Sequence, residues 1–277
     1  MTDSPTRARF AELAALPDER IDLAEAALWI AAEEYPGLDV PRELTRLAEL
    51  AARARARLER FEGAPARVAE LSRFLYGDEG FAGNRTDYYD PRNSFLNEVL
   101  ERKLGIPITL AIVYTSVAAR IGLAARGVGF PSHFLVRIDE PAEILLDPFN
   151  GAIVSRDECA EWLRAAAGEE RLELDPQLLE PTPAKQILAR VLRNLKQIWL
   201  AREEWQRALD CAERILLLAP DTPVELRDRG LLYARLECFA AAEADLRRFL
   251  VLAPDDPTAD AVRAQVEELS RTAPRLH

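Results

Sequence analysis

Hydrophobic residues recur at helical spacing through the first quarter of the chain. Two such stripes are formed by Leu23, Ala26, Ala27 and Ile30 and by Leu44, Leu47, Ala48 and Ala51. Spacings of three and four residues place these side chains on one face of a helix. Prolines stand where such helices would begin or end, at Pro5, Pro36, Pro41 and Pro65. The pattern predicts a helical N-terminal region over residues 6–76.

The segment 77–92 (GDEGFAGNRTDYYDPR) has no clear period and is rich in Gly, Asp, Asn and Pro, which is typical of a loop. Two helices are predicted after it. One runs from Ser94 to Leu104, with Asn93 or Ser94 as its cap and Gly105 at its end. The other runs over 107–121 (PITLAIVYTSVAARI) and is apolar on nearly every side. Such a helix is usually buried at the centre of a domain.

The period changes after Leu123. GVGFPSHFLVRI (127–138) and EILLDPF (143–149) are predicted to form two strands joined by a turn at 139–142. Asn150-Gly151 is a hairpin signal before a third strand at 152–154. Ser155 and Glu158 then form a capping box before a helix that ends near Gly168. The central block is therefore predicted to be α+β with a small antiparallel sheet.

Residues 171–183 (RLELDPQLLEPTP) hold three prolines and are predicted to form a linker. Beyond them, LLLAPDTP (216–223) recurs as LVLAPDDP (250–257), offset by 34 residues. Thirty-four residues is the period of tetratricopeptide repeats, each a pair of helices. The predicted organisation is a domain over 1–170, a linker over 171–183 and an all-α repeat module over 184–277.

Composition excludes several classes of protein. The chain has 47 Asp plus Glu and 36 Lys plus Arg, a formal net charge of −11, so nucleic acid is not an expected partner. Its longest strongly apolar run, AALWIAA, is far shorter than the roughly 20 residues of a membrane span, so no membrane partner is expected. The N-terminus lacks the layout of a secretory signal, and the three cysteines are far apart. We expect a soluble, cytoplasmic protein with reduced thiols and no cofactor, and its oligomeric state stays open.

Imidazole chemistry falls to His133, because the only other histidine is the last residue. If the predicted turn pairs Ile138 with Ile144, then His133 faces Phe149 and lies diagonally across from Asp147. A carboxylate there could hold the imidazole in one tautomer. A register slip of one residue would place the two on opposite faces. In the alternative, His133 is a half-buried strand residue and Asp147 starts a turn. No metal site is expected, because neither residue has a recognisable ligand spacing with other side chains.

An apolar helix opening after glycine, a strand with His and a strand ending in Asp resemble the core of transglutaminase-like cysteine enzymes. More closely, DYYDPRNSFLNEVLERKLGIPITLAIVYTSVAARIGL, GVGFPSHFLVRI and LLDPFNG, followed by tetratricopeptide repeats, resemble the SirB family. The resemblance covers about residues 6–269. It implies an α+β fold: a helical N-terminal region, a transglutaminase-like (papain-like) core with a small antiparallel sheet, and an all-α repeat module.

The enzymes that the core resembles carry their nucleophile at the start of the buried helix, where the helix dipole stabilises a thiolate. Aligning Gly-Ile-Pro at 105–107 with their Gly-x-Cys leaves Pro107 in that position. There is no cysteine before Cys159, which follows His133, so the usual triad cannot be built. The hydroxyls of Thr109 and of Ser94 are candidate replacements, with His133 as the base. The alternative is that Thr109 only bonds back within its own helix.

The leading hypothesis is a non-catalytic transglutaminase-like and tetratricopeptide adaptor that binds a protein or peptide partner; a regulatory role is open. Asn93, Tyr88 and Tyr89 are candidates to line a retained cleft. In the alternative, Asn93 is a helix cap and the two tyrosines anchor the loop. Arg193 and Asn194 belong to a polar stripe on the first repeat helix, with Lys185, Arg190 and Lys196. A polar stripe is usually a solvated face, but this one could contact an acidic peptide or a C-terminal carboxylate.

The competing hypothesis is an enzyme. An amidase, peptidase or transamidase would use His133 and Asp147 with a nucleophile other than cysteine, either Thr109 or an activated water.

Overall fold

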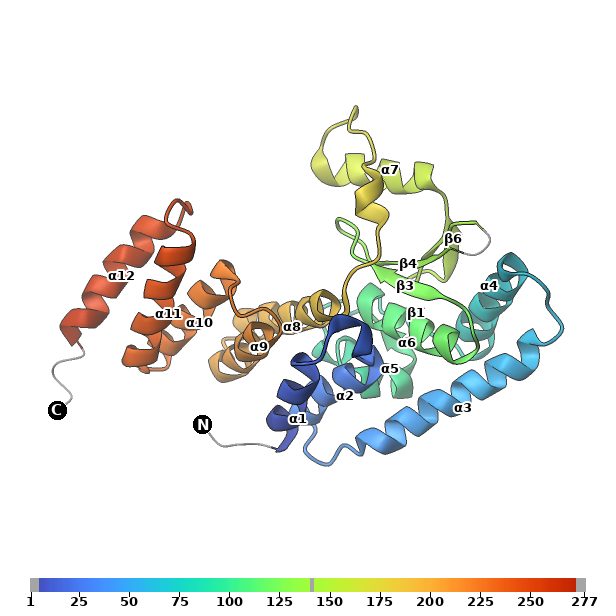
Figure 1. Cartoon of the computed structure of the whole chain (residues 1–277), viewed down its shortest axis with the longest axis horizontal. Coiled ribbons are helices and arrows are strands. Elements are labelled where there is room, and N and C mark those ends of the chain that lie inside the picture. Colours follow the sequence, from blue (N-terminus) through green and yellow to red (C-terminus); the bar gives the residue numbers. More distant parts are fainter. Residues whose placement is uncertain (1–4, 140–141, 273–277) are drawn as a thin grey trace. The chain divides into compact units, whose positions relative to one another are not determined.

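The computed structural model describes residues 5–139 and 142–272. It divides into two compact units, which we call the N-terminal unit (Met1–Ile187) and the C-terminal unit (Leu188–His277). Figure 1 traces the elements of both units along the chain. The fold is mostly helical, with a small antiparallel sheet in the N-terminal unit, as the sequence predicts; the sheet has four strands rather than the three predicted.

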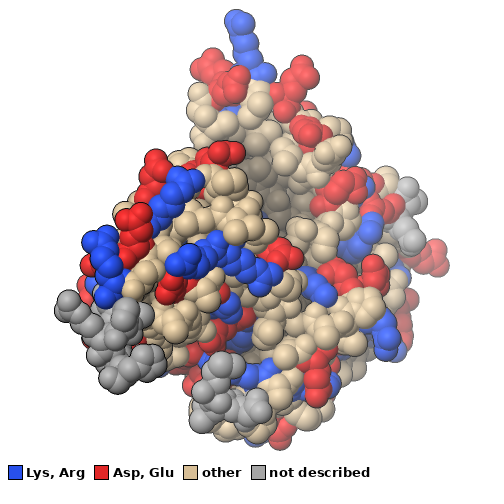
Figure 2. All heavy atoms as spheres, turned by 60° about the vertical axis from the view of Figure 1, so that its left-hand side comes forward, with Lys and Arg blue, Asp and Glu red and all other residues tan. Residues whose placement is uncertain are grey.

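Charged residues of both signs are intermixed on the face drawn in Figure 2, and neither sign gathers there into a continuous patch. Within residues 5–139 and 142–272, no helix combines the length and the apolar content that crossing a membrane requires.

The N-terminal unit begins with helices, which confirms the helical region predicted over 6–76. They are α1 (Pro5–Ala14), η1 (Asp18–Arg20), α2 (Leu23–Glu34), α3 (Val40–Leu58), α4 (Ala64–Ser72) and a π-helical turn η2 (Arg73–Asp78). Asp22 caps α2 by accepting hydrogen bonds from two backbone N–H groups, and Asp39 caps α3 in the same way with one. The carboxylate of Asp18 accepts from the backbone of Ala184 and Lys185, at 2.6 and 3.0 Å, and so fixes the start of α8.

The next helix, α5 (Leu96–Arg102), is shorter than predicted, and neither Asn93 nor Ser94 caps it. Its cap position is Phe95, because the preceding residues turn through η3 (Pro91–Asn93). Lys103 takes a left-handed conformation (φ 61°) and ends the helix two residues before Gly105. Gly105 instead lies in β2 (Leu104–Gly105), which pairs in parallel with β1 (Ala82–Gly83). The loop predicted over 77–92 therefore contains one short strand.

Helix α6 (Pro107–Arg120) forms as predicted and ends before Gly122, which has φ 78°. Every residue from Ile108 to Ala118 is buried. The helix packs against α3, α5, β3 and β4, so it lies at the centre of the N-terminal unit. This position explains why nearly all of its faces are apolar.

The sheet has the order β3 (Ala125–Val128), β4 (Leu135–Ile138), β5 (Ile144–Asp147) and β6 (Ala152–Val154). The predicted pairing of Ile138 with Ile144 is confirmed. The single strand predicted over 127–138 is wrong, because a turn divides it into β3 and β4. Ser132 has φ 57° in this turn, and the backbone N–H of His133 donates to the carbonyl of Phe130. Of the turn predicted at 139–142, residues 140–141 lie outside the described residues.

Helix α7 (Arg156–Ala167) covers one face of the sheet. Its predicted capping box is present, because Ser155 accepts from the backbone of Glu158 and the Glu158 carboxylate accepts from Ser155 in return. Gly168, with φ 69°, ends the helix as predicted. Cys159 and Leu163 of α7 pack with Leu135 and Leu145 of the sheet in one hydrophobic cluster.

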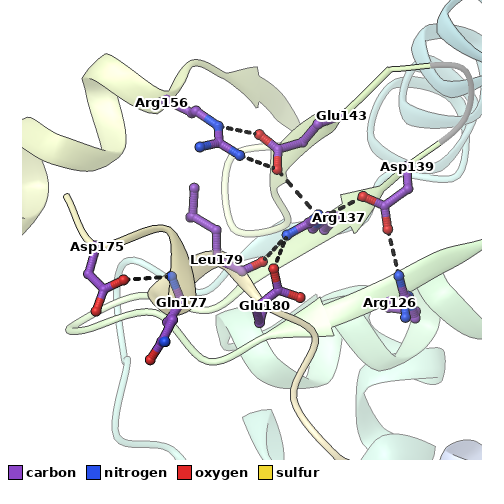
Figure 3. Close-up of polar contacts among 9 residues, drawn as sticks. All are labelled: Arg126, Arg137, Asp139, Glu143, Arg156, Asp175, Gln177, Leu179 and Glu180. Atoms are coloured by element: carbon purple, nitrogen blue, oxygen red, sulfur yellow. Dashed lines mark hydrogen bonds and ion pairs between the residues drawn. The ribbon is translucent and has the colours of Figure 1, made fainter.

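The segment 171–183, predicted to be a linker, lies against the same sheet (Figure 3). Leu179, at the end of η4 (Pro176–Leu179), is fully buried in the α7 cluster. The backbone N–H of Thr182 donates to the carbonyl of Gly127 at 2.8 Å, and Arg137 donates to the carbonyl of Leu179 at 2.9 Å. Buried leucines and satisfied backbone groups make this segment part of the N-terminal unit.

Helix α8 (Ala184–Ala201) begins in the N-terminal unit and continues into the C-terminal unit. The remaining helices are α9 (Trp205–Leu218), α10 (Pro223–Arg235), α11 (Phe239–Leu252) and α12 (Ala259–Thr272). The predicted repeat of 34 residues is visible in the turns. Glu203 and Glu237, which are 34 positions apart, both take left-handed conformations, with φ 58° and 59°. The core between the helices is built around Leu226, Leu246 and Phe249.

Candidate functional site

The start of α6 is the position at which a transglutaminase-like enzyme would carry its nucleophile. Pro107 occupies the first turn, and Thr109 two residues later is completely buried. The Thr109 hydroxyl donates to the carbonyl of Asn93 at 2.7 Å and accepts from the N–H of Ile106 at 3.2 Å. The hydroxyl therefore links the first turn of α6 to the loop that precedes the helix.

Replacing Thr109 by valine is expected to destabilise the chain by about 1–3 kcal/mol, because two buried backbone groups lose their partner. Serine keeps the hydroxyl and loses one buried methyl group, so Thr109→Ser should cost only about 1 kcal/mol. Urea denaturation of both variants measures the difference. A valine variant as stable as the wild type would show that these hydrogen bonds contribute nothing to folding.

Asn93 is the last residue of the loop 84–93. Its side chain is completely buried beneath the loop rather than exposed on its surface. Its amide nitrogen donates to the carbonyl of Asp87 at 2.7 Å, and its amide oxygen accepts from Asn84 at 3.0 Å. The amide oxygen of Asn84 in turn accepts from the backbone N–H of Asp87 at 3.1 Å. The two asparagines thus fix the shape of the loop from within.

The same loop presents Tyr88 and Tyr89 to solvent, with exposed fractions of 45% and 74%. Their rings meet edge to face, 5.3 Å apart, and Tyr88 lies 6.1 Å from Phe149. The guanidinium of Arg85 lies 5.3 Å from the Phe149 ring centre and donates to Asn150. We call Arg85, Tyr88, Tyr89, Phe149 and Asn150 the aromatic platform. It joins the loop to the turn between β5 and β6.

His133 lies just before β4, and Asp147 is the last residue of β5, the strand that pairs with β4. His133 precedes β4, in the turn after β3, and its ring centre lies 4.2 Å from that of Trp162 on α7. The Asp147 carboxylate accepts hydrogen bonds from the backbone of Phe149, at 2.8 Å, and from the side chain of Asn150. Asp147 thus starts the turn between β5 and β6.

The cysteines are all free, and two of the three are buried. Cys159 packs in the α7 cluster, and its burial, with the nearby carboxylates of Glu158 and Glu143, raises the pKa of its thiol to about 11. A thiolate is the reactive form of cysteine, so Cys159 is suited to packing rather than to nucleophilic attack.

Titration with an aromatic disulfide at about pH 8 should therefore modify one thiol per folded chain rapidly, the exposed Cys238. With its pKa near 11, Cys159 is ionised in only about one chain in a thousand at that pH. The denatured chain, in which all three thiols react, calibrates the measurement. A rapidly reacting thiol that persists in Cys238→Ser would contradict the assignment of Cys159 and Cys211 as unreactive.

The polar stripe predicted on α8 is only partly a solvated face. Lys196 is buried, and its ammonium donates to Glu225 at 2.5 Å and to Asp228 at 2.7 Å. Arg193, whose side chain is 43% exposed, also donates to Glu225, at 2.7 Å. Asn194 beside it is half-buried. Sequence reasoning missed Glu225 and Asp228 on α10, although a lysine between Leu195 and Ile198 was a sign that a partner was needed.

No group of three His, Cys, Asp or Glu side chains within residues 5–139 and 142–272 is arranged to hold a metal ion.

Comparison with known proteins agrees with this architecture. Residues 42–193 match the family model of the transglutaminase-like superfamily, and residues 195–267 match a tetratricopeptide repeat model. A UPF0162 protein of Xylella fastidiosa strain Temecula1 is 41% identical over 269 residues, which cover 96% of each chain. A UPF0162 protein of Vibrio cholerae is 34% identical over 254 residues, 91% of this chain and 94% of the relative. Protein SirB1 of Salmonella typhimurium is 29% identical over 246 residues, 88% of this chain and 90% of the relative. The chain thus belongs to the UPF0162/SirB1 family, with a transglutaminase-like core followed by a tetratricopeptide region.

Proposed function

We propose that this protein is a non-catalytic adaptor whose two units bind a protein or peptide partner. The observation that carries the proposal is the start of α6, where Pro107 stands in place of a thiol nucleophile. The nearest candidate hydroxyl, that of Thr109, is buried and donates to a backbone carbonyl. A nucleophile needs both access to the substrate and a base, and this hydroxyl lacks the first.

In the N-terminal unit, the aromatic platform is the surface that supports binding. Tyrosine offers a large contact area with few rotatable bonds, and it is enriched among the residues that dominate binding energy at interfaces. The buried amides of Asn84 and Asn93 hold the loop in shape before a partner arrives. A preformed surface binds more tightly than a flexible one, because less conformational entropy is lost on binding.

In the C-terminal unit, support comes from the repeats, since such arrays typically bind a peptide of a partner protein. Arg193 keeps a partly exposed guanidinium while it donates to Glu225, and Asn194 is half-buried next to it. These two side chains suit an acidic peptide or a C-terminal carboxylate. The free thiols fit a reducing compartment such as the cytoplasm.

The first arm of the test is turnover. A mixed pool of peptides carrying Gln, Asn and backbone amides is incubated with wild type and with His133→Ala at matched thermal stability. The expected result is no product from either protein. Product from the wild type that disappears in His133→Ala would overturn the adaptor and establish the competing amidase or transamidase.

The second arm is binding. Peptides selected from a displayed library on the wild-type chain are measured against Tyr89→Ala and Arg193→Ala. At least one variant is expected to weaken binding about tenfold, which corresponds to about 1.4 kcal/mol. Val251→Ala and Arg263→Ala are the controls, because Val251 is exposed and apolar and Arg263 is an exposed cation. Selected peptides that bind all four variants equally would contradict the proposed surfaces.

A further inference from the structure

A pocket of about 510 Å³ opens in the N-terminal unit between the end of α3 and the α4–η2 segment. Four arginines line it: Arg53, Arg57, Arg60 and Arg73. Phe61 and Phe74 form its apolar part. We call it the arginine pocket. Its lining is unusual in a chain whose formal net charge is −11.

Three of these arginines come from one face of α3 and the residues just beyond it. Arg53 and Arg57 are four residues apart on α3 and so lie on the same face of the helix, and Arg60 follows two residues after its end. Like charges four residues apart on a helix, as in Arg53 and Arg57, repel one another and destabilise it. The arrangement costs stability, and it requires negative charge nearby.

The chain supplies part of that charge from the opposite wall. Glu70, whose side chain is only 6% exposed, accepts from Arg57 and also from Arg73, at 2.8 Å. Arg53 donates to Glu79 at 3.0 Å. Asp78 forms a further ion pair with Arg57, at 2.5 Å. Three carboxylates therefore face four guanidinium groups.

Arg60 is the arginine that remains. It is exposed, and it makes no hydrogen bond or ion pair with another residue of the described ranges 5–139 and 142–272. Phe61, 36% exposed, follows it in the chain, and the guanidinium of Arg57 lies 5.9 Å from the ring centre of Phe74. The pocket thus combines one uncompensated positive charge with two aromatic rings.

The backbone of the opposite wall is also unusual. Arg73 and Phe74 belong to the π-helical turn η2, which directly follows α4. Turns of this kind are rare, and they are found frequently at functional sites. Here the turn contributes one charged and one aromatic side chain to the same pocket.

We propose that the arginine pocket binds a small anion, a phosphate or carboxylate group carried on an aromatic or apolar body. Guanidinium groups match both anions with paired hydrogen bonds, and the rings of Phe61 and Phe74 suit the body. The volume lies within the range of small-molecule sites in proteins. None of the residues that line the pocket belongs to the aromatic platform or to the repeat helices, so the proposal does not depend on the adaptor function.

The experiment is calorimetric titration of the full chain with phenyl phosphate, benzoate, inorganic phosphate and benzyl alcohol in a buffer of low ionic strength. At least one aromatic anion is expected to bind with a Kd of roughly 1 mM or tighter, and benzyl alcohol is not. Preference for phenyl phosphate or for benzoate identifies the anion. Added salt should weaken the binding, because it screens exposed charges.

Arg60→Ala is expected to weaken the aromatic anion about tenfold, with Phe61→Ala producing a smaller loss. Arg60 has no partner to lose among residues 5–139 and 142–272, so this variant should fold normally. Arg42→Ala is the matched control, since Arg42 is an exposed arginine at the other end of α3. Failure of both aromatic anions to bind at roughly 10 mM would overturn the proposal. Equal losses in Arg42→Ala and Arg60→Ala would also overturn it, because they would reflect net charge alone.

Discussion

Replacing Glu225 by leucine is expected to destabilise the C-terminal unit by about 3–5 kcal/mol, because the change leaves the buried ammonium of Lys196 with one partner instead of two. Glu225 is 1% exposed and Lys196 is 2% exposed. A charge held out of water needs its counter-charges, and Asp228, at 2.7 Å, would be the only one left. Hydrogen exchange measured by mass spectrometry should show faster exchange in α8 and α10.

A double variant separates the loss of the pair from the loss of packing. Lys196→Met combined with Glu225→Leu removes both charges and keeps most of the apolar volume, so it should be more stable than Glu225→Leu alone. Asp228 then keeps Arg227, 3.0 Å away. Glu267→Leu is the control for a surface ion pair, and its effect should be below about 1 kcal/mol. A double variant that is as unstable as the sum of its two parts would contradict this explanation.

The elements that sequence predicts well are those whose local signals and long-range contacts agree. Helix α6 is apolar on nearly every side and also lies at the centre of the N-terminal unit. Ser155 and Glu158 carry a capping signal, and a helix starts directly after Ser155. The pairing of Ile138 with Ile144 follows from the turn and from alternation. The repeat of 34 residues is visible because LLLAPDTP and LVLAPDDP are nearly identical.

The features that sequence missed depend on contacts far apart in the chain. Prolines in 171–183 suggest a linker, but they are equally compatible with an extended segment that buries Leu179 on a sheet. The turn at Ser132 carries a local signal, Pro131-Ser132, but the apolar residues on both sides of it favoured the prediction of one continuous strand. The turn places His133 just before β4 rather than inside one continuous strand.

The loop that carries Tyr88 and Tyr89 illustrates the same limit. Its Gly, Asp, Asn and Pro content predicts a loop, yet it does not reveal that the loop is held rigidly from inside by two buried asparagines. The hydroxyl of Thr109 reaches the backbone of Asn93 from a helix 16 positions later. Asn93 therefore connects the start of α6 to the proposed binding surface, and it is the residue whose loss should affect both.

Asn93→Ala is expected to destabilise the N-terminal unit by about 2–4 kcal/mol, since it leaves the Asn84 amide and the Asp87 carbonyl without their partner, and one to three kcal/mol is typical for each such buried group. Hydrogen exchange in 84–93 should accelerate before the rest of the unit. Peptides that depend on Tyr89 should bind more weakly, although both tyrosines remain. Asn97→Ala is the matched control on α5, because the amide oxygen of Asn97 is buried without a hydrogen-bond partner and little is lost when it is removed. Equal stability and equal peptide binding of Asn93→Ala and Asn97→Ala would show that Asn93 does not hold the loop in shape. In that case a preformed loop could not be the reason for the affinity of the aromatic platform.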